Sequence, residues 1–74
     1  MLDRAPAMIT SYEFTYLGPR LTRLQDTVTT WCTANDCALL VTALLQGARL
    51  RITGPEEAVR DAIRTVRVWI RNAA

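Results

Sequence analysis

Cys32 and Cys37 are the most reactive side chains that this sequence offers. A structural zinc site takes four ligands, and the chain has two cysteines and no histidine to supply them. A redox-active pair is normally separated by two residues at the start of a helix, whereas four residues separate these two. We therefore expect buried, free thiols, with no metal site and no cofactor.

The acidic residues are scattered and form no recognisable catalytic set. They are Asp3, Glu13, Asp26, Asp36, Glu56, Glu57 and Asp61. The absence of histidine also removes the commonest general base. Glu13 would act as a base only in a cleft between two chains. We expect no catalytic residue and no enzyme, and we keep a small-molecule or catalytic site at a dimer cleft as the second and less favoured alternative.

Two groups of arginines could contact nucleic acid. One is spaced four, three and four residues apart on a predicted helix and comprises Arg60, Arg64, Arg67 and Arg71. Such a stripe can contact phosphates. Ion pairs with Glu56 and Asp61, four and three residues upstream, favour an ordinary solvated helix face instead. The second group is Arg49 and Arg51.

Three aromatic residues, Tyr12, Phe14 and Tyr16, alternate along a predicted strand and share one of its faces. On an open sheet beside Arg49 and Arg51 they could stack single-stranded bases. Against helices they would belong to the core, and against a second chain they would form an interface. We favour core or interface, because such aromatics are ordinary in a half-buried strand.

Five elements must position these residues. The pattern predicts strands over 8–17, 37–45 and 48–53, and helices over 19–34 and from about 54 to 71. Pro19 suits the first turn of a helix. The first helix presents one apolar stripe, formed by Leu21, Leu24, Val28, Trp31 and Cys32. Asn35 and Asp36 suit its end.

The second half of the chain predicts a hairpin and a helix. Gln46 and Gly47 are expected to form the turn. Thr53 and Glu56 fit a capping box, with Pro55 in the first helical turn. The wide apolar face of this helix consists of Ala58, Val59, Ala62, Ile63, Val66, Trp69 and Ile70.

This order predicts an α+β fold, β-α-β-β-α, which is a truncated ferredoxin-like two-layer sandwich. Its three-stranded sheet would have both helices on one face and strand 48–53 in the middle. Strand 37–45 is apolar on both faces, so a second chain is expected to cover what the helices leave open. The candidate interface residues are Tyr12, Phe14, Tyr16, Leu39 and Val41.

The whole chain has 74 residues and a net charge of +2, enough for one domain over 8–74 behind a flexible tail over 1–7. A domain of this size has a thin stability margin, and a partner chain is one remedy. We expect a homo-oligomer, first a dimer, with no membrane partner. The absence of a leader-like N-terminus predicts a cytoplasmic protein.

The stretch from Ala48 to Ile70 is similar to the closing strand and helix of K-homology RNA-binding domains. The residues that carry this likeness are Leu50, Ile52, Gly54, Glu57, Ala58, Val59, Ala62 and Ile63. The family clamps the nucleic-acid backbone with a glycine-x-x-glycine loop. The three glycines here stand in separate turns, so no binding residue carries over and the likeness is a shared local pattern.

The sequence does not define a function, and it favours a non-enzymatic, self-associating module that binds protein. The first alternative is a small RNA- or DNA-binding protein that uses Arg49 and Arg51 or the arginine stripe. The direction of Tyr12, Phe14 and Tyr16 separates these two readings.

Overall fold

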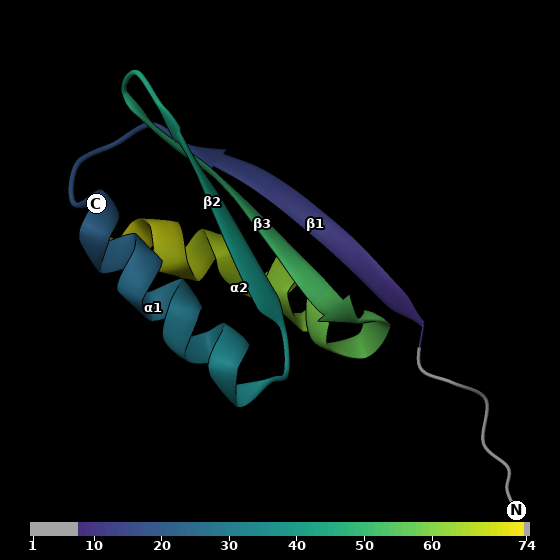
Figure 1. Cartoon of the computed structure of the whole chain (residues 1–74). Helices are drawn as coiled ribbons and strands as arrows, with labels where there is room; N and C mark the ends of the chain where they lie inside the picture. Colours follow the sequence, from purple (N-terminus) through teal and green to yellow (C-terminus); the bar gives the residue numbers. More distant parts are fainter. Residues whose placement is uncertain (1–7, 74) are drawn as a thin grey trace, which may run out of the picture.

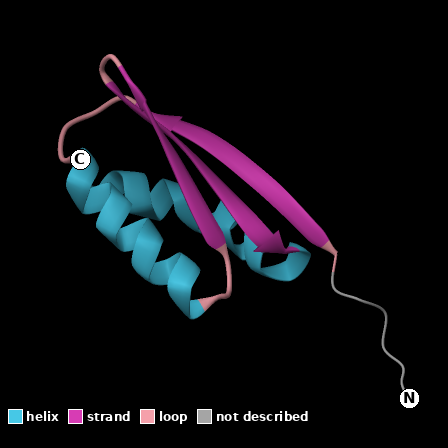
Figure 2. Cartoon of the chain, in the orientation of Figure 1, coloured by secondary structure: helices cyan, strands magenta, loops and turns pink. Residues whose placement is uncertain are grey.

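The computed structural model describes residues 8–73, so the tail predicted for residues 1–7 lies outside the described part of the chain. The elements are β1 (Ile9–Tyr16), α1 (Leu21–Ala34), β2 (Ala38–Leu44), β3 (Gly47–Pro55) and α2 (Glu56–Ala73). The fold is α+β, with two helices and a three-stranded antiparallel open sheet of order β1-β3-β2 (Figure 1). Both helices lie on the same side of the sheet (Figure 2).

The core lies between the sheet and the helices. From α1 it receives Leu24, Val28 and Cys32, which confirms the predicted apolar stripe. The buried residues of α2 are Val59, Ala62, Val66, Trp69 and Ala73. The sheet contributes Phe14, Tyr16, Ala48, Leu50 and Ile52. Trp31 and Trp69 join the helices edge to face, with ring centroids 5.5 Å apart.

The prediction that Ile63 belongs to the core face of α2 is wrong, because 46% of this residue is exposed. Its position on the helix gives the reason. At roughly 100° per residue, Ile63 lies about 80° from the centre of the buried stripe. It therefore lies on the flank of α2 and not against the sheet.

The first helix begins later than predicted. Pro19 precedes α1 by two residues, and Arg20 adopts a left-handed conformation with φ of 62° immediately before the helix. The Tyr16 hydroxyl donates a hydrogen bond of 2.6 Å to the Pro19 carbonyl oxygen, which holds this connection against the end of β1. At the other end of α1, Asp36 is left-handed and Asn35 is not.

The predicted capping box at α2 does not form. Thr53 and Pro55 belong to β3, which continues to Pro55 because β1 pairs with it over the whole length. The Thr53 hydroxyl instead lies 3.0 Å from the Ser11 hydroxyl on the neighbouring strand. The Glu56 backbone N–H donates to the Met8 carbonyl oxygen at 2.9 Å, so the hydrogen bonds between β1 and β3 continue to the first residue of α2.

The hairpin turn is formed by Leu45 and Gln46, one residue earlier than predicted, because Leu44 pairs with Gly47. A Cβ atom at Gly47 would overlap the carbonyl oxygen of Tyr16. Glycine at this position lets β1 and β3 approach at the end of the sheet. The hairpin tip extends past the end of α1 (Figure 1).

Candidate functional site

The sheet separates the predicted aromatic and arginine residues onto opposite faces. In β1, Tyr12, Phe14 and Tyr16 pair with Ile52, Leu50 and Ala48, which are buried beneath the helices. Phe14 and Tyr16 are only 8% and 5% exposed, and Tyr12 is half-buried. Tyr12 and Phe14 stack with ring centroids 6.1 Å apart. These aromatics pack in the chain's own core, on the opposite face from Arg49 and Arg51.

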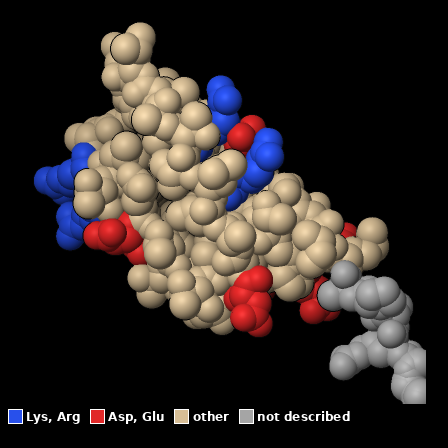
Figure 3. Space-filling model, in the orientation of Figure 1, with Lys and Arg blue, Asp and Glu red and all other residues tan. Residues whose placement is uncertain are grey.

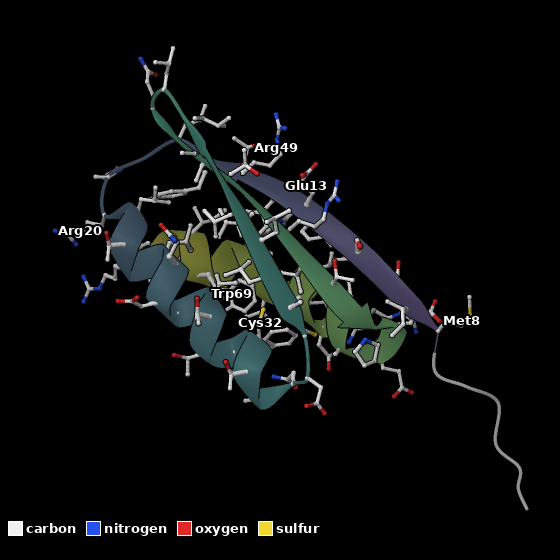
Figure 4. The ribbon with its side chains drawn as sticks, viewed as in Figure 1. Met8, Glu13, Arg20, Cys32, Arg49 and Trp69 are labelled. Atoms are coloured by element: carbon white, nitrogen blue, oxygen red, sulfur yellow. The ribbon has the colours of Figure 1, made fainter. Side chains whose placement is uncertain are left out.

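The face that the helices leave open is mainly polar. Glu13 and Arg49 point away from the helices in Figure 4. Arg51 Nε lies 3.7 Å from Glu13 Oε2, across the β1–β3 pair. Both side chains are exposed, so this ion pair adds little stability. Among the described residues, Arg49 forms no ion pair.

The second strand supplies the apolar part of this open face. Leu40 is 58% exposed and lies beside Arg51 in the register. Leu39 and Val41 are half-buried, and they point to the other face, where they pack against the core. All five predicted interface residues therefore lie on the helix-covered side. Of these, only Tyr12, Leu39 and Val41 keep part of their surface at the sheet edges.

Both outer strands of the sheet have an unpaired edge, and the hydrogen bonds between the strands define which residues face it. Because Glu56 bonds to Met8 opposite it, alternate β1 residues from Thr10 to Tyr16 also bond to β3. Ile9, Ser11, Glu13 and Thr15 direct their backbone groups to the free edge.

The same alternation continues across the sheet. The β3 residues Gly47, Arg49, Arg51 and Thr53 must direct their backbone groups to β2. Their β2 partners are Leu44, Thr42, Leu40 and Ala38. Leu39, Val41 and Ala43 therefore present N–H and C=O groups to the free edge of β2.

The β2 edge carries no charged side chain over Ala38–Leu44. Figure 3 shows a continuous uncharged surface over β2 and the adjoining part of α1, with charged groups at its margins. Natural proteins usually protect sheet edges with charged residues, proline or bulges, and none of these occurs within β2. Of the two free sheet edges in the described chain, the β2 edge has the more apolar side chains.

The arginine stripe of α2 is exposed along its length and partly neutralised. Arg60 Nη2 lies 3.4 Å from Glu56 Oε2, and Arg64 Nη1 lies 3.7 Å from Asp61 Oδ1. Arg67 and Arg71 have no acidic partner within residues 8–73. The stripe is therefore half paired, as the helical spacing predicts.

Both cysteines are free thiols; Cys32 is buried as predicted, whereas Cys37 is only half-buried. Burial, with a smaller contribution from Cys37, raises the pKa of Cys32 to about 11. Burial and the nearby Asp36 also raise the pKa of Cys37. Both residues are therefore protonated at neutral pH, which is the unreactive form of a thiol. Within the described residues, no group of three or more metal-ligating side chains comes together.

Comparisons with protein-family models, with curated proteins and with solved structures found no match for this chain. No function can therefore be transferred to this chain by likeness. No helix within residues 8–73 is long and apolar enough to cross a membrane.

Sequence reasoning missed the β2 edge as a surface. It identified the strand as apolar on both faces but assigned the exposed part to the open sheet face. The signal was present in the absence of charge from Cys37 to Gly47. The register was needed to show that Leu39, Val41 and Ala43 have free backbone groups.

Proposed function

We propose that this chain is a small, non-enzymatic protein-interaction module that associates with itself. In this proposal the fold is a ferredoxin-like sandwich that lacks its last strand. The observation that carries the proposal is the open three-stranded sheet, which has unpaired backbone on both sides and no charge along β2. Such an edge readily pairs with another chain.

The size of the domain supports the same proposal. A small domain buries a modest fraction of its surface, and oligomerisation is one of the common ways to add stability. Here the exposed apolar side chains include Leu40 on β2 and Leu45 at the hairpin tip. A partner chain along the sheet would remove part of this surface from water.

The arrangement gives less support to nucleic-acid binding. Base stacking on a sheet needs aromatic side chains on an exposed face. Phe14 and Tyr16 are buried on the face opposite Arg49 and Arg51. What remains is the arginine stripe of α2, in which Arg60 and Arg64 already have acidic neighbours.

The chemistry of the described residues also argues against a catalytic role. Cys32 and Cys37 are held as thiols, and Glu13 is paired with Arg51. Two free cysteines fit a reducing compartment such as the cytoplasm, where the proposal places the protein.

The proposal is tested by light scattering on a size-exclusion column, with absorbance recorded at 260 and 280 nm. We expect a mass of two chains or a larger multiple, with the absorbance ratio of pure protein. A monomer over the accessible concentration range would contradict the proposal. A monomer that carries nucleic acid until high salt removes it would favour the nucleic-acid-binding alternative instead.

A further inference from the structure

The sheet has two free edges, and they differ in what a second copy would meet there. We propose that β2 is the strand that self-associates, pairing antiparallel with β2 of a second copy across a two-fold axis at Val41. This inference rests on the self-association proposed above and names its site. The result would be a continuous six-stranded sheet with all helices on one face.

The register follows from which residues have free backbone groups. A two-fold axis perpendicular to the sheet keeps the helices of both copies on the same side. It also requires Leu39, Val41 and Ala43 to pair among themselves, because only these residues direct N–H and C=O outward. Centring the axis on Val41 pairs all seven residues of β2. Three of those pairs would exchange about two hydrogen bonds each.

The side chains of β2 are complementary in size in this register. Val41 lies opposite its own copy, Leu39 lies opposite Ala43, and Leu40 lies opposite Thr42. At the ends of the strand, Ala38 lies opposite Leu44. Each leucine therefore faces a smaller side chain, and no pair brings like charges together. This self-complementarity is the reason to name a second copy, and not an unrelated protein, as the occupant.

The helix beneath the β2 edge is also compatible with a close copy. Trp31 contacts Trp69, so that side of α1 is turned towards α2. At roughly 100° per residue, the opposite flank presents Thr22, Gln25 and Thr29. These three side chains are uncharged, as is the part of α1 that adjoins β2 in Figure 3. Two such flanks can approach without electrostatic repulsion.

The β1 edge is less suitable for pairing with itself. Its central residue Glu13 directs its backbone to that edge and carries a charge. Below it, the flank of α2 that lies away from Trp31 includes Arg60 and Arg67. Arg60 is already paired with Glu56, but pairing through β1 would bring Glu13 and Arg67 of one copy close to those of the other, and like charges at short range disfavour association.

Proline substitutions at the two edges provide a matched test. Ala43→Pro removes an outward N–H from β2, and Thr15→Pro removes one from β1. Both residues are exposed, and neither N–H belongs to the β3 ladder. Proline is tolerated on an edge where the N–H faces solvent, so neither substitution should disrupt the fold of the single chain. Dimer dissociation would be measured by sedimentation, with circular dichroism as the check on folding.

We expect Ala43→Pro to weaken association at least about tenfold, since each copy loses a hydrogen-bond donor at the interface. Thr15→Pro should keep the wild-type dissociation constant. Ala43→Glu and Thr15→Glu repeat the comparison without changing the backbone, should either proline variant fail to fold. The carboxylate of Ala43→Glu should dissociate the dimer, whereas that of Thr15→Glu should not.

The outcomes separate this inference from the proposed function. If the Ala43 variants remain dimeric while the Thr15 variants dissociate, the assignment of the interface to β2 is wrong, whereas self-association still holds. A dimer unaffected by any of the four would also overturn it, because neither edge would then pair. A monomeric wild-type chain would overturn both proposals.

Discussion

At the scale of single residues, Cys32 illustrates how position determines chemistry. The side chain lies on the apolar stripe of α1 and is buried between the helices and the sheet, as the spacing of the stripe predicts. Burial raises its pKa to about 11, which keeps it protonated at neutral pH. The sequence predicts this residue well because a helical stripe needs only local spacing.

Cys32→Ala should lower the free energy of unfolding by about 1 kcal/mol, because a buried group is lost and a small cavity remains. Chemical denaturation at pH 7 measures the change. Thr33→Ala, at the exposed neighbouring position, is the control and should have a smaller effect. Zinc in the wild-type protein that disappears in the Cys32 variant would contradict the structural role.

The same thiol predicts a loss of stability in alkaline solution. The unfolded chain loses the Cys32 proton near the ordinary pKa of 9.0, whereas the folded chain keeps it until about 11. Deprotonation therefore favours the unfolded state as pH rises between these values, and the contribution is fully present below pH 9. The wild type should lose stability across this window more steeply than Cys32→Ala. Parallel curves for the two proteins would exclude the effect.

At the scale of elements, the order, type and approximate position of all five segments follow from the sequence, whereas several boundaries do not. Thr53 and Pro55 fit a helix start locally, yet β1 extends β3 through both. Pairing between residues more than forty positions apart decides that boundary. Local spacing contains no information about it.

The connection before α1 contains a second such departure, and it makes a prediction. Arg20 is left-handed at the helix N-terminus and forms no side-chain cap. Arg20→Asn should raise the free energy of unfolding by about 0.5–1 kcal/mol, because asparagine tolerates this conformation and removes a positive charge from the positive end of the helix dipole.

Arg20→Ala separates the two causes, since it removes the charge but keeps a residue disfavoured in this conformation. It should gain less than Arg20→Asn. Thermal or chemical denaturation of the three proteins provides the comparison. A loss of stability in Arg20→Asn would show that the arginine side chain contributes an interaction that outweighs both effects.

The two faces of β2 predict different responses to a carboxylate. Val41 packs against the core on the helix side, so Val41→Asp should cost about 2 kcal/mol or more by placing a charge in an apolar environment. Leu40→Asp, on the open face beside Arg51, should cost far less. Equal unfolding free energies for the two variants would show that the assignment of faces is wrong.

At the scale of the whole molecule, the central feature is a sheet that ends in unpaired strands. The sequence predicts that β2 needs cover, because the strand is apolar on both faces. It cannot show that the free groups belong to Leu39, Val41 and Ala43, since this depends on the register of three strands. The surface we propose to be functional is therefore a property of the assembled sheet. The buried aromatics of β1 stabilise the core of that sheet and are not part of the proposed interface.

Residue-resolved amide hydrogen exchange, measured by NMR on the wild-type chain at increasing concentration, tests this account most directly. We expect the amides of Leu39, Val41 and Ala43 to exchange rapidly in dilute solution and to become protected as the dimer forms. The outward amides of Ser11, Glu13 and Thr15 should remain fast throughout. If the protein is dimeric while the β2 amides stay fast, or the β1 amides become protected in their place, β2 is not the strand through which the copies pair.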